Sequence, residues 1–152
     1  MNSPVGELLI KSRGDSITDV SFLRTERGPE TITAPIRQCI SELNEYFKGT
    51  RKFFTVALDP VGTEFQKRVW DVLLEIPFGR SISYSQQASK VGDLKSIRAV
   101  ATANGQNPIA IIIPCHRVIG KDGSLVGYGG GLENKTWLLK HEGILSDQLQ
   151  LF

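Results

Sequence analysis

A cysteine and a histidine stand side by side at Cys115-His116, in a chain of 152 residues that has only two of each. A thiol is a nucleophile only as the thiolate, and a neighbouring imidazole is the commonest group that produces a thiolate at neutral pH. Pro114 fixes an extended approach and lacks a backbone donor, so we expect the thiol at a sharp corner. The alternative is a core cysteine without chemistry, because free cysteine is among the most buried residue types.

Composition limits the other kinds of site. A length of 152 residues fits one large or two small domains. The contents of 40% hydrophobic and 22% charged residues are typical of a globular protein. No apolar run is long enough to cross a membrane, and the N-terminus lacks a signal pattern. Two cysteines make no disulfide framework, which predicts a reducing, intracellular location: the cytoplasm, or the nucleus in a eukaryote. The four cysteines and histidines lack paired ligand spacing, so we expect no metal, and no cofactor motif is present.

The charge is unevenly distributed. Residues 1–76 contain 10 basic and 11 acidic side chains, a net charge of −1, whereas residues 77–152 contain 8 and 5, a net charge of +3. The second half is therefore the better candidate to meet an anionic partner.

The elements of the first half predict a scaffold. Strand-like segments at 6–10 and 17–23 flank a turn signal and suggest a hairpin. A helix is predicted over 35–48, with Cys39 on its apolar stripe and therefore in the core. A further strand is predicted at 53–58. No acid, base and nucleophile come together here, so residues 1–59 are predicted to be a scaffold domain.

Residues 60–152 are predicted to form the domain that carries the chemistry. Thr63 with Gln66 and Ser83 with Gln86 are capping-box signatures that start helices at 64–75 and 84–91. A second short helix at 94–103 completes the outline of a helix-turn-helix. A β-branched run at 109–113 predicts a buried strand that delivers Cys115, and a last helix is predicted at 132–142.

A hairpin is predicted at 118–126, with Asp122-Gly123 as its two-residue turn. A hairpin after a helix-turn-helix is the pattern of a winged helix. Lys121 at its tip is a candidate for a phosphate contact.

Taken together and in this order, these motifs resemble the O6-alkylguanine-DNA alkyltransferases, DNA-repair proteins that move an alkyl group from guanine to their own cysteine. The match runs through Pro77-Phe78-Gly79, Ile82-Ser83-Tyr84, Arg98-Ala99-Val100, Asn107-Pro108, Ile113-Pro114-Cys115-His116-Arg117-Val118, Tyr128 with Gly130-Gly131-Leu132, Trp137-Leu138-Leu139 and His141-Glu142-Gly143. It covers essentially the whole second half, and less specifically the first. The resemblance implies an α/β (α+β) fold: a small ribonuclease-H-like domain of sheet and helix, followed by a winged helix-turn-helix domain.

The resemblance also implies roles for the site residues. Glu142 would hold His116, and His116, through a water, would take the proton of Cys115. The thiolate would attack the alkyl carbon on O6 of guanine, or on O4 of alkylthymine, while Asn107 orders the turn under the cysteine. Tyr128 would donate to a ring nitrogen, and the Cys115 and Val118 carbonyls would accept from the exocyclic amine. The Gly129 N–H is the remaining donor toward the guanine oxygen.

The product would be a thioether that no residue here displaces, so the protein would act once, without a cofactor. The partner implied is double-stranded DNA, bound in the minor groove by a monomer, with the target nucleotide flipped out. Arg98 would replace the flipped base in the stack, and Tyr84 would press on the neighbouring phosphate. The small side chains of Ala99 and its neighbours would let the helix approach the groove floor.

Two departures and several alternatives accompany this prediction. Ala101 stands where many relatives have glycine, and Gly129 where some have serine. Asn107 is otherwise a turn residue, Arg98 a surface ion pair and Tyr84 a core ring. Other functions would be a lesion-binding relative without an acceptor cysteine, a winged-helix regulator or a cysteine hydrolase. Cys115 argues against the first. A winged-helix regulator would give no reason for the Cys115–His116–Glu142 set. The DNA-binding pattern disfavours a cysteine hydrolase.

Overall fold

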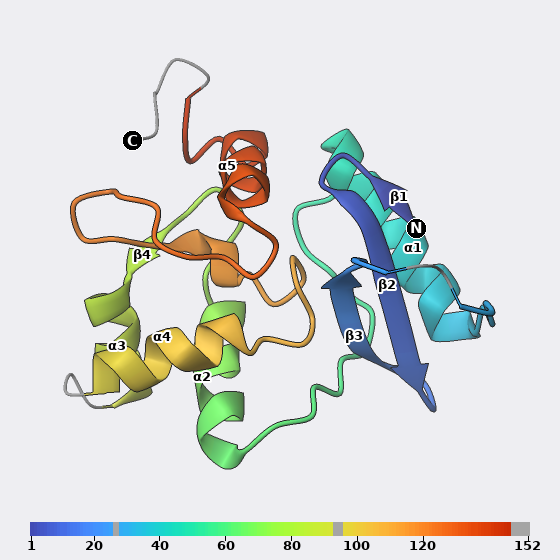
Figure 1. Cartoon of the computed structure of the whole chain (residues 1–152), viewed down its shortest axis with the longest axis horizontal. Helices are drawn as coiled ribbons and strands as arrows, with labels where there is room; N and C mark the ends of the chain where they lie inside the picture. Colours follow the sequence, from blue (N-terminus) through green and yellow to red (C-terminus); the bar gives the residue numbers. More distant parts are fainter. Residues whose placement is uncertain (26–27, 93–95, 147–152) are drawn as a thin grey trace. The chain divides into compact units, whose positions relative to one another are not determined.

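The computed structural model describes residues 1–25, 28–92 and 96–146 (Figure 1). The chain divides into two units. The first consists of Met1–Val61 with Pro108–Ile112, and the second of Gly62–Asn107 with Ile113–Phe152. No helix in the described part of the chain is long and apolar enough to span a membrane.

The first unit is a small antiparallel sheet with a helix packed on it (Figure 1). The strands β1 (Asn2–Ser3), β2 (Gly6–Arg13) and β3 (Ser16–Phe22) lie in that order. Helix α1 (Ala34–Lys48) begins at Thr33, whose side chain accepts from the Ile36 N–H, and ends at Gly49 with φ 83°. Cys39 lies fully buried on its inner face. The predicted hairpin, helix and core thiol are therefore confirmed.

The strand predicted at 53–58 is wrong. This segment makes only one isolated bridge, between Leu58 and Ile17. Its backbone is held instead by the buried carboxylate of Glu42 on α1, which accepts from the N–H groups of Thr55 at 2.8 Å and Val56 at 3.2 Å. A side chain has therefore taken the hydrogen bonds that a strand partner would have made.

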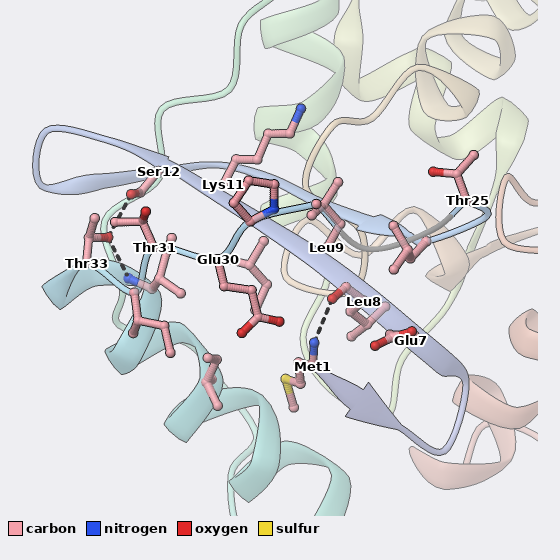
Figure 2. Close-up of a pocket in the computed structure, with 17 residues that line it drawn as sticks. Met1, Glu7, Leu8, Leu9, Lys11, Ser12, Thr25, Glu30, Thr31 and Thr33 are labelled. Carbon is pink, nitrogen blue, oxygen red and sulfur yellow. Dashed lines mark hydrogen bonds between the residues drawn. The ribbon is translucent and has the colours of Figure 1, made fainter.

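The first unit also contains a cavity of about 770 Å³ between β2, the segment 28–33 and α1 (Figure 2). Its walls are mainly aliphatic. The Met1 ammonium at one end donates to the Leu8 carbonyl at 2.9 Å, and the Thr33 hydroxyl lies 2.8 Å from that of Ser12. No cysteine or histidine is among the described residues that line it, so the cavity has no nucleophile of the predicted type.

The second unit is built from helices (Figure 1). Helices α2 (Glu64–Leu74), α3 (Tyr84–Val91) and α4 (Ile97–Gly105) pack against one another, and α5 (Leu132–His141) follows later in the chain. Both predicted capping boxes are present, at Thr63 and Ser83. The second helix of the predicted helix-turn-helix starts at Ile97; its expected first residues, 94 and 95, lie outside the described residues.

A reciprocal amide pair joins α3 to α4. Gln87 and Asn104 exchange two hydrogen bonds of 2.7 Å, and both side chains are buried. The Trp70 indole of α2 donates to the Ala103 carbonyl at 2.9 Å. These contacts fix the three helices to one another through polar groups that are satisfied inside the core.

The buried strand predicted at 109–113 is wrong in conformation, although the run is buried as expected. Only Ile109 bridges β3, at Val20. The chain then turns at Ile111, where the Ile112 N–H donates to the Ala110 carbonyl at 2.8 Å around a φ of 73°. This is the rare γ-turn with positive φ, which a β-branched residue adopts only under strain. Apolar patterning predicts burial here but cannot choose the backbone conformation.

The hairpin predicted at 118–126 is also not formed as a ladder. Strand β5 (Val118–Ile119) pairs in parallel with β4 (Ile82–Ser83), and no second strand follows it in the described residues. A turn closed by the Gly120 N–H and the Ser124 carbonyl, 2.7 Å apart, places Lys121 on the exposed surface. The carbonyls of Val126 and Gly127 on the returning arm accept hydrogen bonds from the Lys135 ammonium instead.

Candidate active site

Cys115 lies directly after a tight turn. Pro114 has φ −85° and ψ 65°, and the Cys115 N–H donates to the Ile113 carbonyl at 2.9 Å. This inverse γ-turn is the sharp corner that the proline predicted, and a 3-10 helix over Cys115–Arg117 follows it. The Asn107 amide donates to the Ile113 carbonyl at 2.7 Å and to the Cys115 sulfur at 3.3 Å. Asn107 therefore holds both the turn and the thiol.

The next residue after the cysteine, His116, forms a buried pair with a carboxylate. His116 Nε2 is 2.6 Å from Glu142 Oε2, and neither side chain is exposed. Glu142 immediately follows α5, where an acidic side chain is unfavourable beside the helix dipole. With the Nε2 proton directed at Glu142, Nδ1 carries the lone pair. Nδ1 is buried and accepts no hydrogen bond from the described residues, so it is the ring nitrogen that can take a proton.

Arg117 compensates the charge of Glu142, a contact that the sequence patterns did not predict. Its guanidinium donates to both carboxylate oxygens, Nε to Oε1 at 2.7 Å and a terminal nitrogen to Oε2 at 3.2 Å. It also donates to the Ile76 carbonyl at 2.6 Å. This two-point contact fixes the plane of the carboxylate, and hence the orientation of the imidazole. In the sequence, the only indication that Arg117 belongs to the site was its position next to the Cys-His pair.

The electrostatics define the protonation states of the resting site. Burial raises the pKa of the Cys115 thiol, against the hydrogen bond from Asn107 and the charge of Lys135. Burial also lowers the pKa of His116, against the pull of Glu142. Burial alone would raise the pKa of Glu142, but His116 and Arg117 lower it to about 2. The resting set is thus a thiol, a neutral imidazole and a carboxylate, which is the state from which proton transfer to His116 can start.

The thiol borders a cavity of about 430 Å³, a size typical of small-molecule sites. The described lining consists of Tyr84, Ile97, Arg98, Ala101, Asn104, Gly105, Cys115, Val126, Gly127, Tyr128 and Gly129. The structure therefore brings five of the predicted residues to one cavity: Cys115, Tyr84, Arg98, Tyr128 and Gly129. Ala99 is exposed on α4 outside this lining, as is Lys121 on its turn, and Val118 is buried.

The polar side chains around the cavity are held in different ways. The Tyr84 hydroxyl donates to the Val126 carbonyl at 2.9 Å, which bridges α3 to the loop after β5. The Tyr128 hydroxyl is buried, and burial raises its pKa well above the ordinary value, so it remains a protonated donor. Arg98 is exposed on α4 and has no ion pair among the described side chains, which disfavours its interpretation as a surface salt bridge.

Lys135 is the second residue that the sequence patterns did not predict. It lies on α5 and is only 1% exposed. Its ammonium donates to the Val118 carbonyl at 2.8 Å and, at longer range, to those of Gly127 at 3.4 Å and Val126 at 3.5 Å. Burial lowers its pKa to about 8. The available signal was its spacing from Leu138, Leu139 and Glu142, which places a lysine on the buried stripe of the helix.

Within the described ranges, no group of three or more histidine, cysteine, aspartate or glutamate side chains could hold a metal ion. The polar groups that the structure shows at the site are a thiol, a buried imidazole–carboxylate pair and several hydrogen-bond donors.

Comparisons with known proteins agree with this arrangement. The model of the 6-O-methylguanine DNA methyltransferase ribonuclease-like domain matches residues 1–60, and that of the DNA-binding domain matches residues 64–144. The methylated-DNA–protein-cysteine methyltransferase of Mycobacterium leprae is 44% identical over 93% of this chain and 89% of its own. That of Methanosarcina acetivorans is 44% identical over 93% and 94%.

Solved structures give the same result. The Mycobacterium tuberculosis O6-methylguanine methyltransferase is 41% identical, covers 98% of this chain and 93% of its own, and has a TM-score of 0.86. The M. tuberculosis OGT in complex with DNA is 45% identical over 93% and 89%, with a TM-score of 0.85.

A ribonuclease-like unit followed by a DNA-binding unit, with a cysteine next in sequence to a buried histidine–carboxylate pair, defines a DNA-repair alkyltransferase. The chain belongs to the 6-O-methylguanine DNA methyltransferase family. The predicted family, the mixed α/β fold, the methyltransferase class and DNA as a partner are confirmed.

Proposed function

We propose that this chain removes alkyl groups from O6-alkylguanine, and from O4-alkylthymine, in double-stranded DNA and keeps them on the sulfur of Cys115. The observation that carries the proposal is the placement of Cys115 at a cavity, while the next residue, His116, forms a buried pair with Glu142. Cys39 offers no alternative acceptor, because it is fully buried and burial raises its pKa to about 12.

The residues divide the reaction among them. His116, through a water, takes the Cys115 proton, and Glu142, whose carboxylate is held in place by Arg117, stabilises the imidazolium that results. The thiolate then forms a sulfur–carbon bond as the carbon–O6 bond breaks, and the electron pair leaves on the guanine. Tyr128 donates to a ring nitrogen, and the Gly129 N–H to the guanine oxygen, where negative charge develops. The imidazolium of His116 releases its proton back through the water, and the guanine anion takes up one proton and stays in the DNA as the repaired base.

The same chemistry makes the reaction irreversible. A thioether sulfur is a poor leaving group, and the described site contains no second nucleophile positioned to displace it. Each protein molecule therefore accepts one alkyl group. The cysteine is consumed as a reactant rather than regenerated.

Access to the alkylated oxygen requires the nucleotide to leave the stack, since the atom lies inside the duplex. Arg98 and Ala101 lie on the same side of α4 at the cavity, with Ala99 exposed beside them. We assign α4 to the minor groove, Arg98 to the vacated position and Tyr84 to the neighbouring phosphate. Lys121, exposed on its turn, is assigned to a more distant phosphate. We assign the protein to act as a monomer, since every residue assigned to the site comes from one chain and none has to be supplied by a second copy.

The two domains have different assigned roles. We place the boundary between a scaffold of residues 1–59 and an alkyl-transfer domain of residues 60–152. The ranges matched by the two domain models, 1–60 and 64–144, support a boundary near this point. Every residue assigned above to catalysis, substrate or DNA lies after it.

The test is a mass measurement. The protein is incubated with a duplex oligonucleotide that contains O6-methylguanine, and intact and peptide masses are recorded. We expect one added methyl group on Cys115 per molecule, its absence in Cys115→Ser and its retention in the control Cys39→Ala. A protein that stays unmodified, or that clears many lesions per molecule, would refute the proposal.

A further inference from the structure

The cavity of the first unit lies along an open edge of the sheet (Figure 2). Strand β2 has β3 on one side, whereas on the other side β1 covers only its first residues, Gly6 and Glu7. Met1 extends this cover by one position, because it exchanges two backbone hydrogen bonds with Leu8, of 2.7 and 2.9 Å. From Ile10 onward, this side of β2 has no strand beside it in the described part of the chain.

The hydrogen bonds of β3 show where the backbone groups of Ile10 point. Ile10 stands opposite Val20 in the ladder. The Val20 N–H donates to the Pro108 carbonyl at 2.9 Å, and the Val20 carbonyl accepts from the Ala110 N–H at 2.8 Å, so both groups point away from β2. Ile10 and Val20 therefore form a non-hydrogen-bonded pair, and the N–H and carbonyl of Ile10 point outward as well. By the alternation of a strand, Ser12 faces the same edge.

The outward groups of Ile10 have no hydrogen-bond partner among the described residues. They face a cavity of about 770 Å³, whose lining includes Leu8, Ile10 and Ser12. Free N–H and carbonyl groups at strand spacing are the template on which another extended chain adds to a sheet. The backbone of this edge is therefore suited to a peptide strand.

The wall toward α1 is suited to apolar side chains. Leu8 is buried in the core, and Ile10 lies on the same face of the sheet because side chains alternate along a strand. The lining of the cavity includes Ile36 and Ile40 of α1. A strand added at this edge would bury every second side chain against these aliphatic groups.

The opposite face carries a positive charge. Leu9 and Lys11 are exposed there. Lys11 has no ion pair among the described side chains, whereas Glu7 and Glu30, the carboxylates of the lining, each take part in another interaction. The uncompensated charge of the groove is thus positive, and an acidic side chain across from Lys11 would satisfy it.

We propose that the open edge of β2 binds an extended, acidic segment of another polypeptide, which adds to the sheet as a strand antiparallel to β2 and in line with β1. Apolar side chains at every second position of this segment face Ile36 and Ile40, and the acidic side chains between them face Lys11. The interaction goes beyond alkyl transfer, because it gives the first unit a binding role in addition to that of a scaffold.

Peptides with methylated backbones test the strand geometry. The probe is a fluorescent heptapeptide in which valine and glutamate alternate, and its binding to the full chain is followed by anisotropy. Because cross-strand neighbours share a face, the valines that face α1 are the residues whose N–H groups point at β2. We expect N-methylation of the valines to weaken binding about tenfold or more. N-methylation of the glutamates, whose N–H groups point away from β2, should change the affinity less than about twofold.

The charge is tested by a substitution and by a second peptide. We expect Lys11→Glu to weaken binding of the probe about fivefold, as for the loss of an exposed ion pair. Lys48→Glu is the matched control, because it changes the net charge equally at a residue of α1 outside the lining. A peptide with lysine in place of glutamate should bind the wild type more weakly than the probe and Lys11→Glu more tightly. Both variants should transfer methyl groups as fast as the wild type.

The outcomes separate strand addition from its alternatives. A probe that does not bind, or that loses affinity equally on either pattern of N-methylation, refutes strand addition at this edge. Equal affinities of the acidic and basic peptides refute the acidic partner. Sedimentation of the protein alone tests a second copy as the occupant: a dimer that the probe dissociates would overturn the proposal. Failure of the wild type to accept a methyl group refutes the proposed function and leaves these peptide measurements unaffected.

Discussion

His116 Nε2 lies 2.6 Å from Glu142 Oε2, with both side chains excluded from solvent and Arg117 on the far side of the carboxylate. The pair joins residues that are 26 positions apart in the chain. Glu142 supplies a buried negative charge beside His116, which offsets part of the cost of burying an imidazolium, although burial still lowers the pKa of His116.

The first prediction concerns this pair. Glu142→Gln keeps the shape of the side chain but removes the charge that stabilises the imidazolium. We expect the single-turnover rate of methyl transfer to fall 10²-fold or more, in the range for loss of general acid–base assistance. The variant should also be less stable, because Arg117 is left as a buried cation without its partner. Rapid-quench kinetics on an excess of protein, together with thermal unfolding, check both parts. A variant as fast as the wild type would exclude Glu142 from catalysis.

The second prediction is a loss of stability in acid. The pKa of Glu142 is lowered to about 2 in the folded protein, so its contribution to stability is complete above about pH 4.5 and is lost as the pH falls toward 2. The lowered pKa of His116 acts in the same direction, since unfolding lets the ring take a proton below its ordinary pKa. We therefore expect the midpoint of thermal unfolding to fall from pH 7 to pH 3. Glu142→Gln should flatten the lower part of this curve, and equal slopes in the two proteins would contradict the assignment.

The third prediction concerns Gly129. A side chain at this position meets no atom within 4 Å, and its backbone is outside the left-handed region. Gly129→Ser should therefore fold normally and add a hydroxyl beside the guanine oxygen. We expect methyl transfer to become several-fold faster, since one added donor is the only change at the reacting centre. Gly131→Ser is the control, because the backbone there has φ 92° and ψ 152°, where a side chain is strained by about 1 to 3 kcal/mol. A slower Gly129→Ser would show that the hydroxyl has no access to the substrate.

The fourth prediction concerns the amide pair between α3 and α4. Asn104→Leu leaves the buried Gln87 amide without its two hydrogen bonds, so we expect a loss of about 2 to 3 kcal/mol in the free energy of unfolding. The double variant Gln87→Leu with Asn104→Leu should recover most of that loss, because it leaves no polar group unsatisfied. Urea unfolding of the wild type, the two single variants and the double variant gives the coupling energy between Gln87 and Asn104. Additive effects of the two substitutions would show that the side chains are not coupled.

Features with local causes were predicted from sequence. Thr63 and Ser83 begin their helices because a hydroxyl and a glutamine three residues later satisfy the first free N–H groups. Pro114 puts Cys115 at a corner because its ring restricts φ. The apolar stripe of α1 buries Cys39 because helical spacing places those residues on one face. In each case the interacting atoms are within one or two turns of chain.

Features that depend on distant partners were not predicted. The segment 53–58 is not a strand because Glu42 takes its N–H groups, and the run 109–113 turns at Ile111 although its composition favours a strand. The two arms of the loop after Val118 do not pair with each other. The carbonyls of Val118 and Val126, one on each arm, accept hydrogen bonds from Lys135 of α5. A backbone donor or acceptor bonds to whichever partner folding brings near, and local sequence does not specify that partner.

The sequence by itself predicted the candidate nucleophile and its neighbouring base, and it identified the two capped helix starts and the family to which the chain belongs, because these depend on residue types at short spacing. The tertiary structure decided the charges around the thiol. Arg117 and Lys135 read in sequence as ordinary basic residues, and only packing shows that both are buried, Arg117 against the Glu142 carboxylate and Lys135 against the Val118 carbonyl. Burial gives such charges their strength, since electrostatic interactions weaken in water and strengthen where the fold excludes it.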